Sequence, residues 1–386
     1  MKQNLKNLIA VYKKKNPSII NKSFFYKKFL TRRQKLFRDL LKLPPKIFEN
    51  AEVLDLPCGT GENSIIFSDK VKNLTCVDAN LKALNLYKKK IRLMKVEKNK
   101  FKFINTSLEK FKLKKKFDVI LFEGLLHHTL NPYTNFNKII KFLKKDGFII
   151  VGTVSELGGF QKILSRLLVF NNCKNNQEII KFVKKYFTTE LDRATKSGGR
   201  PVMNIIYDHY INPILKGLDF RKLFLIAKKN NLNYYSSFPN LETGRTKNTI
   251  NDKLNSDDLM SSKFYSLKEL TNLLSTNIEN SEKISSKKLI ALNKKLKKII
   301  KSHNIYNSNY KSELKNFNLE SIKKINDLFV EVINEESNDI KKKFQFFFND
   351  LLLLKKNNLN TLIKHSKNIF KGSNGVPINY IVFYKK

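Results

Sequence analysis

Cysteine is scarce in this chain. Cys58, Cys76 and Cys173 are the only three among 386 residues. They form no CxxC pair and no spacing typical of metal ligands, so the sequence predicts neither a disulfide framework nor a metal site. This usage fits a reducing compartment, and we expect a cytoplasmic protein.

Long apolar runs are also missing. Residues 8–12 form a short apolar run before three lysines, too short for a signal peptide. Residues 344–354 are more apolar, but Asn349 and Asp350 interrupt them, and the run is well below the roughly 20 residues that a membrane-spanning helix needs. We therefore expect a soluble protein with no membrane span.

Acidic residues are few, 33 against 75 lysines and arginines, which gives a formal net charge of +42. Nine of these 75 basic residues are arginine, and the others are lysines spread along the chain. The chain is also rich in asparagine, isoleucine and phenylalanine. AT-biased codon usage produces this mixture of residues whatever the function of the protein. Because base and phosphate recognition favours the planar fork of arginine, the charge predicts nonspecific attraction to polyanions rather than sequence-specific recognition.

A strand followed by a glycine-bearing turn is the most informative feature. Residues 53–56 are apolar apart from Asp55, and Gly59 and Gly61 follow them. Glycine leaves no Cβ between such a turn and a ligand, and we expect the chain to enter a helix whose first N–H groups point at that ligand. A second strand, residues 74–77, ends at Asp78, whose carboxylate can accept hydrogen bonds from both hydroxyls of a ribose.

The turn resembles the DxGxGxG turn of the class I S-adenosylmethionine-dependent methyltransferases. It extends from Asp55 to Gly61, with Pro57 in place of the first glycine, which suits a position that needs neither a positive φ nor an N–H group. A dinucleotide-binding GxGxxG motif counted from Gly59 would need glycine or alanine where Ser64 stands. The similarity is to bacterial small-molecule methyltransferases, and it implies S-adenosylmethionine as the cofactor.

Further segments continue the resemblance in register. Residues 101–105 and 117–122 are expected to be the third and fourth strands, and residues 143–147 resemble the family's LKPGG turn, which leads into a fifth strand at 148–151. Residues 233–238 are a sixth strand, and the carboxyl-terminal strand begins with Asn374 and Gly375, typical of a hairpin. The expected fold is α/β: a Rossmann-like, seven-stranded, mostly parallel sheet with helices on both faces, its last strand antiparallel between the fifth and sixth.

Four segments are expected in sequence. Residues 1–50 would form an amino-terminal helical cap over the cofactor edge, with a basic amphipathic stretch at 24–43. Residues 51–244 would form the methyltransferase core with its substrate-side helices. Residues 245–372 would be a lysine- and asparagine-rich helical insertion, and residues 373–386 would be the strand that closes the sheet. In the insertion we expect a small helical subdomain rather than disorder, with a flexible loop at 301–315 as the alternative for that segment. The subdomain is indicated by two apolar stripes at helical spacing: Leu289, Leu292, Leu296, Ile299 and Ile300, then Leu319, Ile322, Ile325, Leu328, Phe329 and Val332.

The resemblance places the cofactor at the carboxyl ends of the first four strands. Ser107 stands where the family often has an acidic residue near the adenine, so contacts there depart from the family pattern. The expected cofactor-binding residues are Asp55, Pro57, Cys58, Gly59, Gly61, Asp78, Ala79, Ser107, Leu108, Glu123 and Gly124.

Two histidines, His127 and His128, follow the fourth strand, beside the position where the family holds the reacting methyl. A base is needed only when the acceptor must lose a proton, as a hydroxyl does, and either histidine could orient or deprotonate an acceptor. The alternative is that one caps the following helix or packs structurally. Adjacent histidines are expected to point apart, which excludes a shared metal ion.

A cluster of polar residues lies farther along, where Tyr207, Asp208 and His209 precede Asn212 and Pro213. It resembles a DxxxNP segment of some bacterial small-molecule methyltransferases, and it makes Asp208 a third catalytic candidate, with Tyr207 and His209 as substrate contacts. The alternative is that Asp208 caps a helix against which the tyrosines pack.

Several acceptor classes are excluded. The fourth strand is followed by Glu123, Gly124 and Leu125. These residues do not form the Asn/Asp-Pro-Pro-aromatic turn that enzymes use to methylate the exocyclic amine of a base, and they include no cysteine, which methylation of cytosine at C5 requires. They also lack the clustered carboxylates that metal-dependent methylation of catechols requires. The leading prediction is methylation of a small molecule or a sugar- or lipid-linked precursor. The alternatives are an RNA methyltransferase and a noncatalytic protein that retains the fold.

Overall fold

The computed structural model describes residues 10–11, 23–94, 96–241, 262–275, 285–303, 319–332, 338–356, 358–366, 369–371 and 378–386. Asn374 and Gly375, the expected start of the last strand, lie outside the described residues, as does the segment 304–315 of the expected loop; its first residues, 301–303, end a helix. None of the helices in these ranges is long and apolar enough to cross a membrane.

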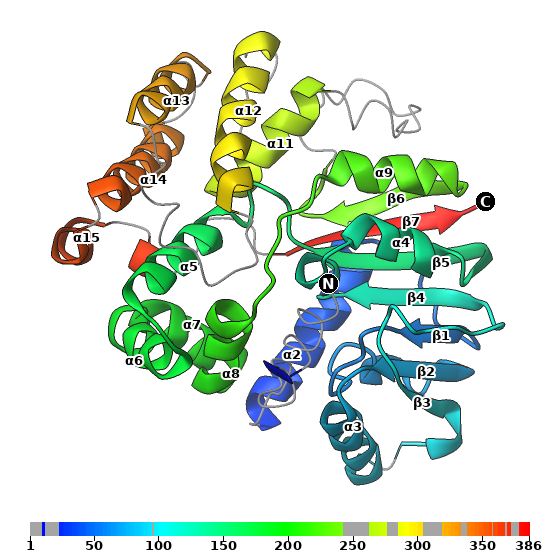
Figure 1. The fold of residues 1–386 in the computed structure, drawn as a ribbon. Helices are drawn as coiled ribbons and strands as arrows, with labels where there is room; N and C mark the ends of the chain where they lie inside the picture. The colour runs from blue at the N-terminus through cyan, green and yellow to red at the C-terminus, as the bar shows by residue number, and fades with distance from the viewer. Residues whose placement is uncertain are drawn as a thin grey trace.

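A seven-stranded sheet forms the centre of the molecule, in the order β3-β2-β1-β4-β5-β7-β6 (Figure 1). The first five strands pair in parallel, and β7 is antiparallel to both β5 and β6, which confirms the predicted fold class. The strands are β1 (Glu52–Asp55), β2 (Asn73–Asp78), β3 (Phe101–Asn105), β4 (Phe117–Glu123), β5 (Leu143–Thr153), β6 (Leu232–Phe238) and β7 (Asn379–Lys385).

Strand β1 is the innermost part of the nucleotide-binding half. Val53 and Leu54 are fully buried because β2 and β4 flank β1 and helices cover both faces, which is why this strand is apolar on both sides. Parallel pairing brings the strand ends to one edge of the sheet. Asp55, Asp78, Asn105 and Glu123 end β1 to β4 there.

Strand β5 begins earlier than predicted. The segment 143–147, expected to be a turn before the strand, is the first part of β5, because Leu143 pairs with Phe117 before the register shifts. Asp146 takes a positive φ of 59° inside it. The irregularity that the sequence indicates is therefore a distortion within the strand rather than a turn outside it.

Helices cover both faces of the sheet. On one face, α4 (Pro132–Ile140) and α9 (Phe220–Lys229) bury Phe136 and Phe224. On the other face lie α3 (Leu81–Leu93) and the helix formed by α2 (Ser23–Lys35) and its π-helical continuation η1 (Leu36–Leu40). Asn80 caps α3 by accepting from the N–H groups of Lys82 and Ala83.

The turn after β1 does not enter an α-helix, so that prediction is wrong. Only a short 3-10 helix, η2 (Ile65–Phe67), follows. Serine and β-branched residues at 64–68 are poor helix formers, and their side chains have other partners. The hydroxyl of Ser64 lies 3.0 Å from that of Tyr87, and Ser68 Oγ donates back to the carbonyl of Ile65.

A separate helical unit lies beside the carboxyl edge of the sheet (Figure 1). It draws one hydrophobic core from two distant segments, residues 157–211 and 267–369, so the helices after β5 and those of the expected insertion pack together. Its helices are α5 (Phe160–Asn172), α6 (Asn176–Tyr186), α7 (Thr188–Gly198), α8 (Val202–Ile206), η5 (Tyr207–Ile211), α11 (Ser262–Leu274), α12 (Ser286–His303), α13 (Leu319–Val332), α14 (Asn338–Lys356), α15 (Leu359–His365) and η8 (Ile369–Lys371).

The predicted stripes provide part of this core. Leu289, Leu292 and Leu296 are fully buried on α12, and Ile325 and Phe329 are buried on α13. The apolar stripes of α12 and α13 belong to one hydrophobic core, which also includes residues of α14. There, Phe344 of α14 stacks on Phe329 of α13. The side chains of Ile299, Ile300, Leu319 and Ile322 lie outside the described residues.

Leu270→Ala tests whether α11 is an integral part of the fold. Leu270 is fully buried in the core of the helical unit, so the substitution should lower the free energy of unfolding by about 2–5 kcal/mol, measured by urea denaturation. Leu225→Ala, on α9 at 57% exposure, is the matched control and should cost less than about 0.5 kcal/mol. Equal, small effects would mean that α11 does not pack as described.

Candidate active site

The turn after β1 is held by hydrogen bonds from its own backbone. Leu56 N–H donates to Leu121, Cys58 N–H to Val77 and Gly59 N–H to the carboxylate of Asp78. The expectation that these N–H groups point at a ligand is therefore wrong for Cys58 and Gly59, because the ends of the neighbouring strands already accept them. The turn is preformed by the protein itself.

The two turn glycines both have backbone conformations that favour glycine. Gly59 and Gly61 both take positive φ, 54° and 80°, which other residues rarely adopt. A Cβ on Gly61 would lie 2.1 Å from the ring of Tyr87, so this glycine is required by the packing of α3 rather than by the approach of a ligand. Pro57 follows a cis peptide bond in the same turn.

Asp78 ends β2 with a half-buried carboxylate. Its Oδ2 accepts from Gly59 N–H at 2.9 Å and its Oδ1 from Asn80 N–H at 2.7 Å. Burial raises the pKa of the carboxyl, and these two hydrogen bonds oppose the rise. Each carboxylate oxygen has a further lone pair, so the group can still accept from a pair of hydroxyls while it holds the turn. Ala79 follows it, half-buried, in the same turn.

Asp55 is a buried carboxyl beneath the turn, 2% exposed. Its Oδ2 has no hydrogen-bond partner among the described residues. Burial raises its pKa to about 8, and the negative charge of Glu123 adds to the rise. A buried acceptor without a partner is costly, and a cation or donor brought by a ligand would relieve it.

The end of β3 has a second buried polar atom without a partner. Ser107 Oγ has no hydrogen-bond partner among the described residues, and the adjoining Leu108 is buried. The position differs from the family pattern, yet it presents a hydroxyl and an apolar surface side by side. Such a pair suits the edge and face of a heteroaromatic ring.

Glu123, at the end of β4, already has a partner. Nη1 of Arg33 on α2 lies 2.6 Å from its Oε2, Nη2 contacts its Oε1, and both side chains are about 95% buried. The guanidinium also lies over the rings of Phe37 and Tyr380. Gly124 follows with a φ of 75° and open space where a Cβ would stand. The basic residues of α2 could have indicated Arg33 as a candidate for the site, but nothing in the sequence indicates that it pairs with Glu123.

His127 and His128 lie on a 3-10 helix after β4, and their rings are 4.2 Å apart. The prediction that they point apart is wrong, because both are buried in the same space. Neither caps the next helix, since Asn131 holds that position. Burial holds the pKa of His127 well below its usual value and also lowers that of His128, so both are neutral at pH 7.

The predicted cluster after α8 reaches the same place. Asp208 Oδ1 lies 3.8 Å from His128 Nε2, and its Oδ2 lies 2.9 Å from Nη2 of Arg200. Burial alone would raise the pKa of Asp208, but Arg200, His209 and His128 hold it well below its usual value. Asp208 lies inside η5, so the alternative that it caps a helix is not realised.

The other two predicted substrate residues differ in position. His209 Nε2 lies 3.7 Å from Asp208 Oδ2, and its Nδ1 lies 2.8 Å from Oε1 of Glu190. The other carboxylate oxygen of Glu190, Oε2, accepts from the hydroxyl of Tyr210 at 2.6 Å. Tyr207 packs instead against the core of the helical unit. Glu190, which sequence reasoning missed, is buried; Lys162 and His209 overcome the effect of burial and hold its pKa well below the usual value.

The residues therefore gather in two groups at one edge. Asp55, Asp78, Ser107 and Glu123 lie at the ends of β1 to β4, while His128 joins the sheet to Asp208 and His209 of the helical unit. Within the described ranges, no group of three His, Cys, Asp or Glu side chains is arranged to hold a metal ion.

Part of this chain is similar to known proteins. Residues 29–189 match a family model described as a methyltransferase domain. The mitochondrial ubiquinone biosynthesis O-methyltransferase of Schizosaccharomyces pombe is 26% identical over 133 residues, 34% of this chain and 47% of that protein. The ubiquinone biosynthesis O-methyltransferase of Rickettsia typhi is 22% identical over 50% of this chain and 78% of that protein. The chain thus spans about half the length of the first of these relatives.

Among solved structures, PKMT2 from Rickettsia typhi in complex with AdoHcy is 20% identical, and the match covers 64% of this chain and 50% of that one. The TM-score of 0.43 is too low to support an inference about activity. The domain match and the relatives indicate that residues 29–189 are a methyltransferase domain, which agrees with the predicted class I S-adenosylmethionine-dependent methyltransferase and its cofactor.

The site fits this cofactor. Asp78 can accept from ribose hydroxyls, Ser107 and Leu108 offer a polar atom and an apolar surface for the adenine, and the partnerless Oδ2 of Asp55 can take a donor. The open space beside Gly124 leaves room for a ligand at the end of β4.

Asp78→Ala should weaken S-adenosylmethionine affinity at least tenfold, because each lost charge-assisted hydrogen bond costs roughly 1.5–3 kcal/mol. Isothermal titration calorimetry measures this. The exposed Asp69, whose carboxylate accepts from Ser68 Oγ at 3.0 Å, supplies the control Asp69→Ala, which should leave the affinity unchanged. Unchanged affinity in Asp78→Ala would show that the cofactor is held elsewhere.

Asp55 predicts a pH dependence of stability. Its pKa is raised from 3.8 to about 8, so between these pH values the folded protein keeps a proton that the unfolded chain has lost. The free energy of unfolding of the cofactor-free protein should therefore fall as the pH rises through this window. Asp55→Asn cannot ionise and should be more stable than the wild type at pH 8 but not at pH 4, measured by urea denaturation. Parallel pH profiles would contradict the assignment.

Proposed function

We propose that this protein transfers the methyl group of S-adenosylmethionine to a hydroxyl of a small molecule or of a sugar- or lipid-linked precursor. The observation that carries this proposal is the neutral, buried His128 beside the ionised Asp208 at the end of β4. A hydroxyl acceptor must lose a proton, and this pair supplies a base at the edge where the cofactor residues gather.

The tautomer of His128 follows from its hydrogen bond. Nδ1 lies 2.7 Å from the carbonyl oxygen of Ile214, which can only accept, and 3.0 Å from the amide Nδ2 of Asn212, which can only donate. The carbonyl contact is the shorter of the two, and it requires the proton on Nδ1. Nε2 then holds the lone pair and faces Asp208. A hydroxyl placed at Nε2 would give its proton to a ring that is already oriented for it.

Asp208 has a supporting role in this scheme. Its low pKa makes it a weak base, but its negative charge next to Nε2 favours the imidazolium that forms when His128 takes the proton. Arg200 keeps Asp208 ionised and in place. When bound, S-adenosylmethionine supplies a methyl group activated by the positive charge on its sulfur, and the protein's part is to position the acceptor and exclude water.

The names of the relatives agree with an oxygen acceptor, since both curated relatives are called O-methyltransferases. The matched part of the first is about half of that protein, so its substrate is not carried over. No feature of the described residues favours RNA over a small molecule as the acceptor, and the charge alone implies only nonspecific attraction to polyanions.

His128→Asn is the most direct test. The asparagine amide can still donate to the carbonyl of Ile214, but it has no basic nitrogen in place of Nε2. The rate of methyl transfer should fall about a hundredfold or more, while S-adenosylmethionine affinity shifts less than threefold. The acceptor is first identified by transfer of labelled methyl groups to metabolite and RNA pools.

The exposed His365 on α15 supplies the control, and His365→Asn should leave both quantities unchanged. Equal loss of turnover and of cofactor affinity in His128→Asn would give His128 a structural role instead. Labelling confined to RNA would replace the proposed acceptor class, and cofactor binding without any transfer would identify a noncatalytic protein.

A further inference from the structure

The outer face of α3 combines two kinds of side chain. Lys82, Leu86, Lys89 and Leu93 follow one another at intervals of four, three and four residues, so they line one face of the helix. All four are exposed, because the opposite face of α3 is buried and includes Tyr87. We call Lys82, Leu86, Lys89 and Leu93 the α3 surface. Figure 1 shows α3 at the lower margin of the molecule, below β2 and β3.

The apolar part of the α3 surface is unusually exposed. Leu86 is 43% exposed and Leu93 is 73% exposed, and Met94, which follows Leu93, is 42% exposed. A single exposed leucine is common on protein surfaces and needs no partner, and Leu225 of α9, 57% exposed, is an example. Leu86 and Leu93 differ from it because they are aligned two turns apart on one helix face. They therefore form a small apolar surface in contact with water.

Positive charge surrounds these leucines. Residues 82–116 contain fourteen lysines and arginines but only two acidic residues, a far higher density of positive charge than the +42 over 386 residues of the whole chain. Among the described residues, no carboxylate pairs with Lys82 or Lys89. Glu97, the first acidic residue after α3, lies 3.2 Å from Nζ of Lys100. The lysines of the α3 surface are therefore available to an external anion.

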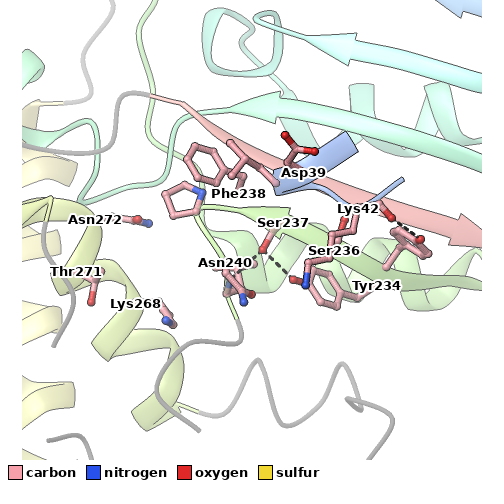
Figure 2. A pocket seen from close by; sticks show the side chains of 14 residues that line it. Asp39, Lys42, Tyr234, Ser236, Ser237, Phe238, Asn240, Lys268, Thr271 and Asn272 are labelled. Atoms are coloured by element: carbon pink, nitrogen blue, oxygen red, sulfur yellow. Dashed lines mark hydrogen bonds between the residues drawn. The ribbon is translucent and has the colours of Figure 1, made fainter. Parts of the chain in front are cut away.

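The α3 surface is separate from the sites of the molecule. Tyr87 of α3 packs edge-on against Phe103 of β3, the strand at one edge of the sheet. The cavity of about 540 Å³ in Figure 2 lies beside β6, the strand at the other edge. The residues assigned above to the cofactor and the acceptor do not include any of the α3 surface. Substitutions in this surface should therefore leave cofactor affinity and turnover unchanged.

An anionic lipid membrane matches both parts of the α3 surface. Leucine side chains are removed from water when they enter the boundary of the acyl chains, and lysines reach headgroup phosphates while their alkyl chains pack beside the leucines. A nucleic acid would pair with the lysines but leave the leucines in water. A specific protein interface needs a larger apolar core than two leucines, since it buries roughly 800 Å² on each partner.

We propose that the α3 surface docks the protein on anionic lipid membranes. Leu86 and Leu93 enter the lipid boundary, and Lys82 and Lys89 pair with anionic headgroups. The contact is peripheral, because only the outer side chains of one helix take part in it. This interaction goes beyond methyl transfer and does not depend on the identity of the acceptor.

A single introduced tryptophan tests the insertion, because the chain contains none. The full chain is mixed, at physiological salt, with vesicles of phosphatidylcholine and phosphatidylserine in equal parts. The fluorescence of Leu93→Trp should shift to shorter wavelength as the ring leaves water, and lipids with brominated acyl chains should quench it. Leu225→Trp, at the exposed leucine of α9, is the matched control and should show neither change. The proposal is overturned if Leu93→Trp shows neither change, or if Leu225→Trp changes as much.

Vesicle sedimentation measures the contribution of the leucines to affinity. Leu86→Gln with Leu93→Gln keeps the charge and should weaken binding at least tenfold, because less apolar surface leaves water. The control, Leu225→Gln with Val330→Gln, changes two exposed apolar residues of α9 and α13 and should alter binding less than twofold. Wild-type binding by the first variant would identify a surface for polyanions in general and would overturn membrane docking.

The charge is tested in the same assay. Lys82→Gln with Lys89→Gln should weaken binding at least fivefold, because each lysine near an anionic lipid surface adds to the attraction. Lys181→Gln with Lys184→Gln removes the same charge from exposed positions of α6 and should alter binding less than twofold. Equal losses in the two lysine variants would mean that net charge alone attracts the protein to the vesicles, which contradicts a defined docking surface.

Discussion

The buried ion pair between Arg33 and Glu123 holds the candidate active site together. Both charges are removed from water, which is costly unless the geometry is good, and here the contact is bidentate and the guanidinium lies over two aromatic rings. The pair fixes α2 to the end of β4, and Tyr380 adds the last strand to the same contact. Elements from the start, middle and end of the chain thus meet where the predicted cofactor-binding residues gather.

The carboxyl edge of the sheet divides the chemistry between two parts of the molecule. The sheet supplies the polar groups suited to the cofactor. Among them, Asp55 Oδ2 and Ser107 Oγ are buried without a hydrogen-bond partner in the part of the chain that the structure describes. The helical unit supplies Asp208, which lies 3.8 Å from His128 after β4, and His209, which lies 3.7 Å from Asp208. Because the core of that unit combines residues before and after β6, the acceptor side depends on the long segment after the sixth strand as well as on the helices after the fifth.

Local patterns predicted most of the fold. Apolar strands such as β1, the acidic strand ends and the stripe of Leu289, Leu292 and Leu296 are visible in the sequence because each reflects the burial of a single element. Pairings between distant side chains carry no local pattern. Arg33 with Glu123 and His209 with Glu190 are contacts across the fold, and the close, tilted contact between the rings of His127 and His128 depends on the space around them. The missing helix after Gly61 reflects side-chain partners that only the folded chain provides.

Hydrogen exchange with and without S-adenosylhomocysteine tests the central claim most directly, namely that the carboxyl edge of β1 to β4 holds the cofactor. The account predicts slower exchange at residues 55–61, 78–80, 105–109 and 123–128, with little change in α12 and α14, because ligand contacts and the closed edge suppress local opening there. Unchanged exchange in these four segments, with protection elsewhere or nowhere, would contradict it.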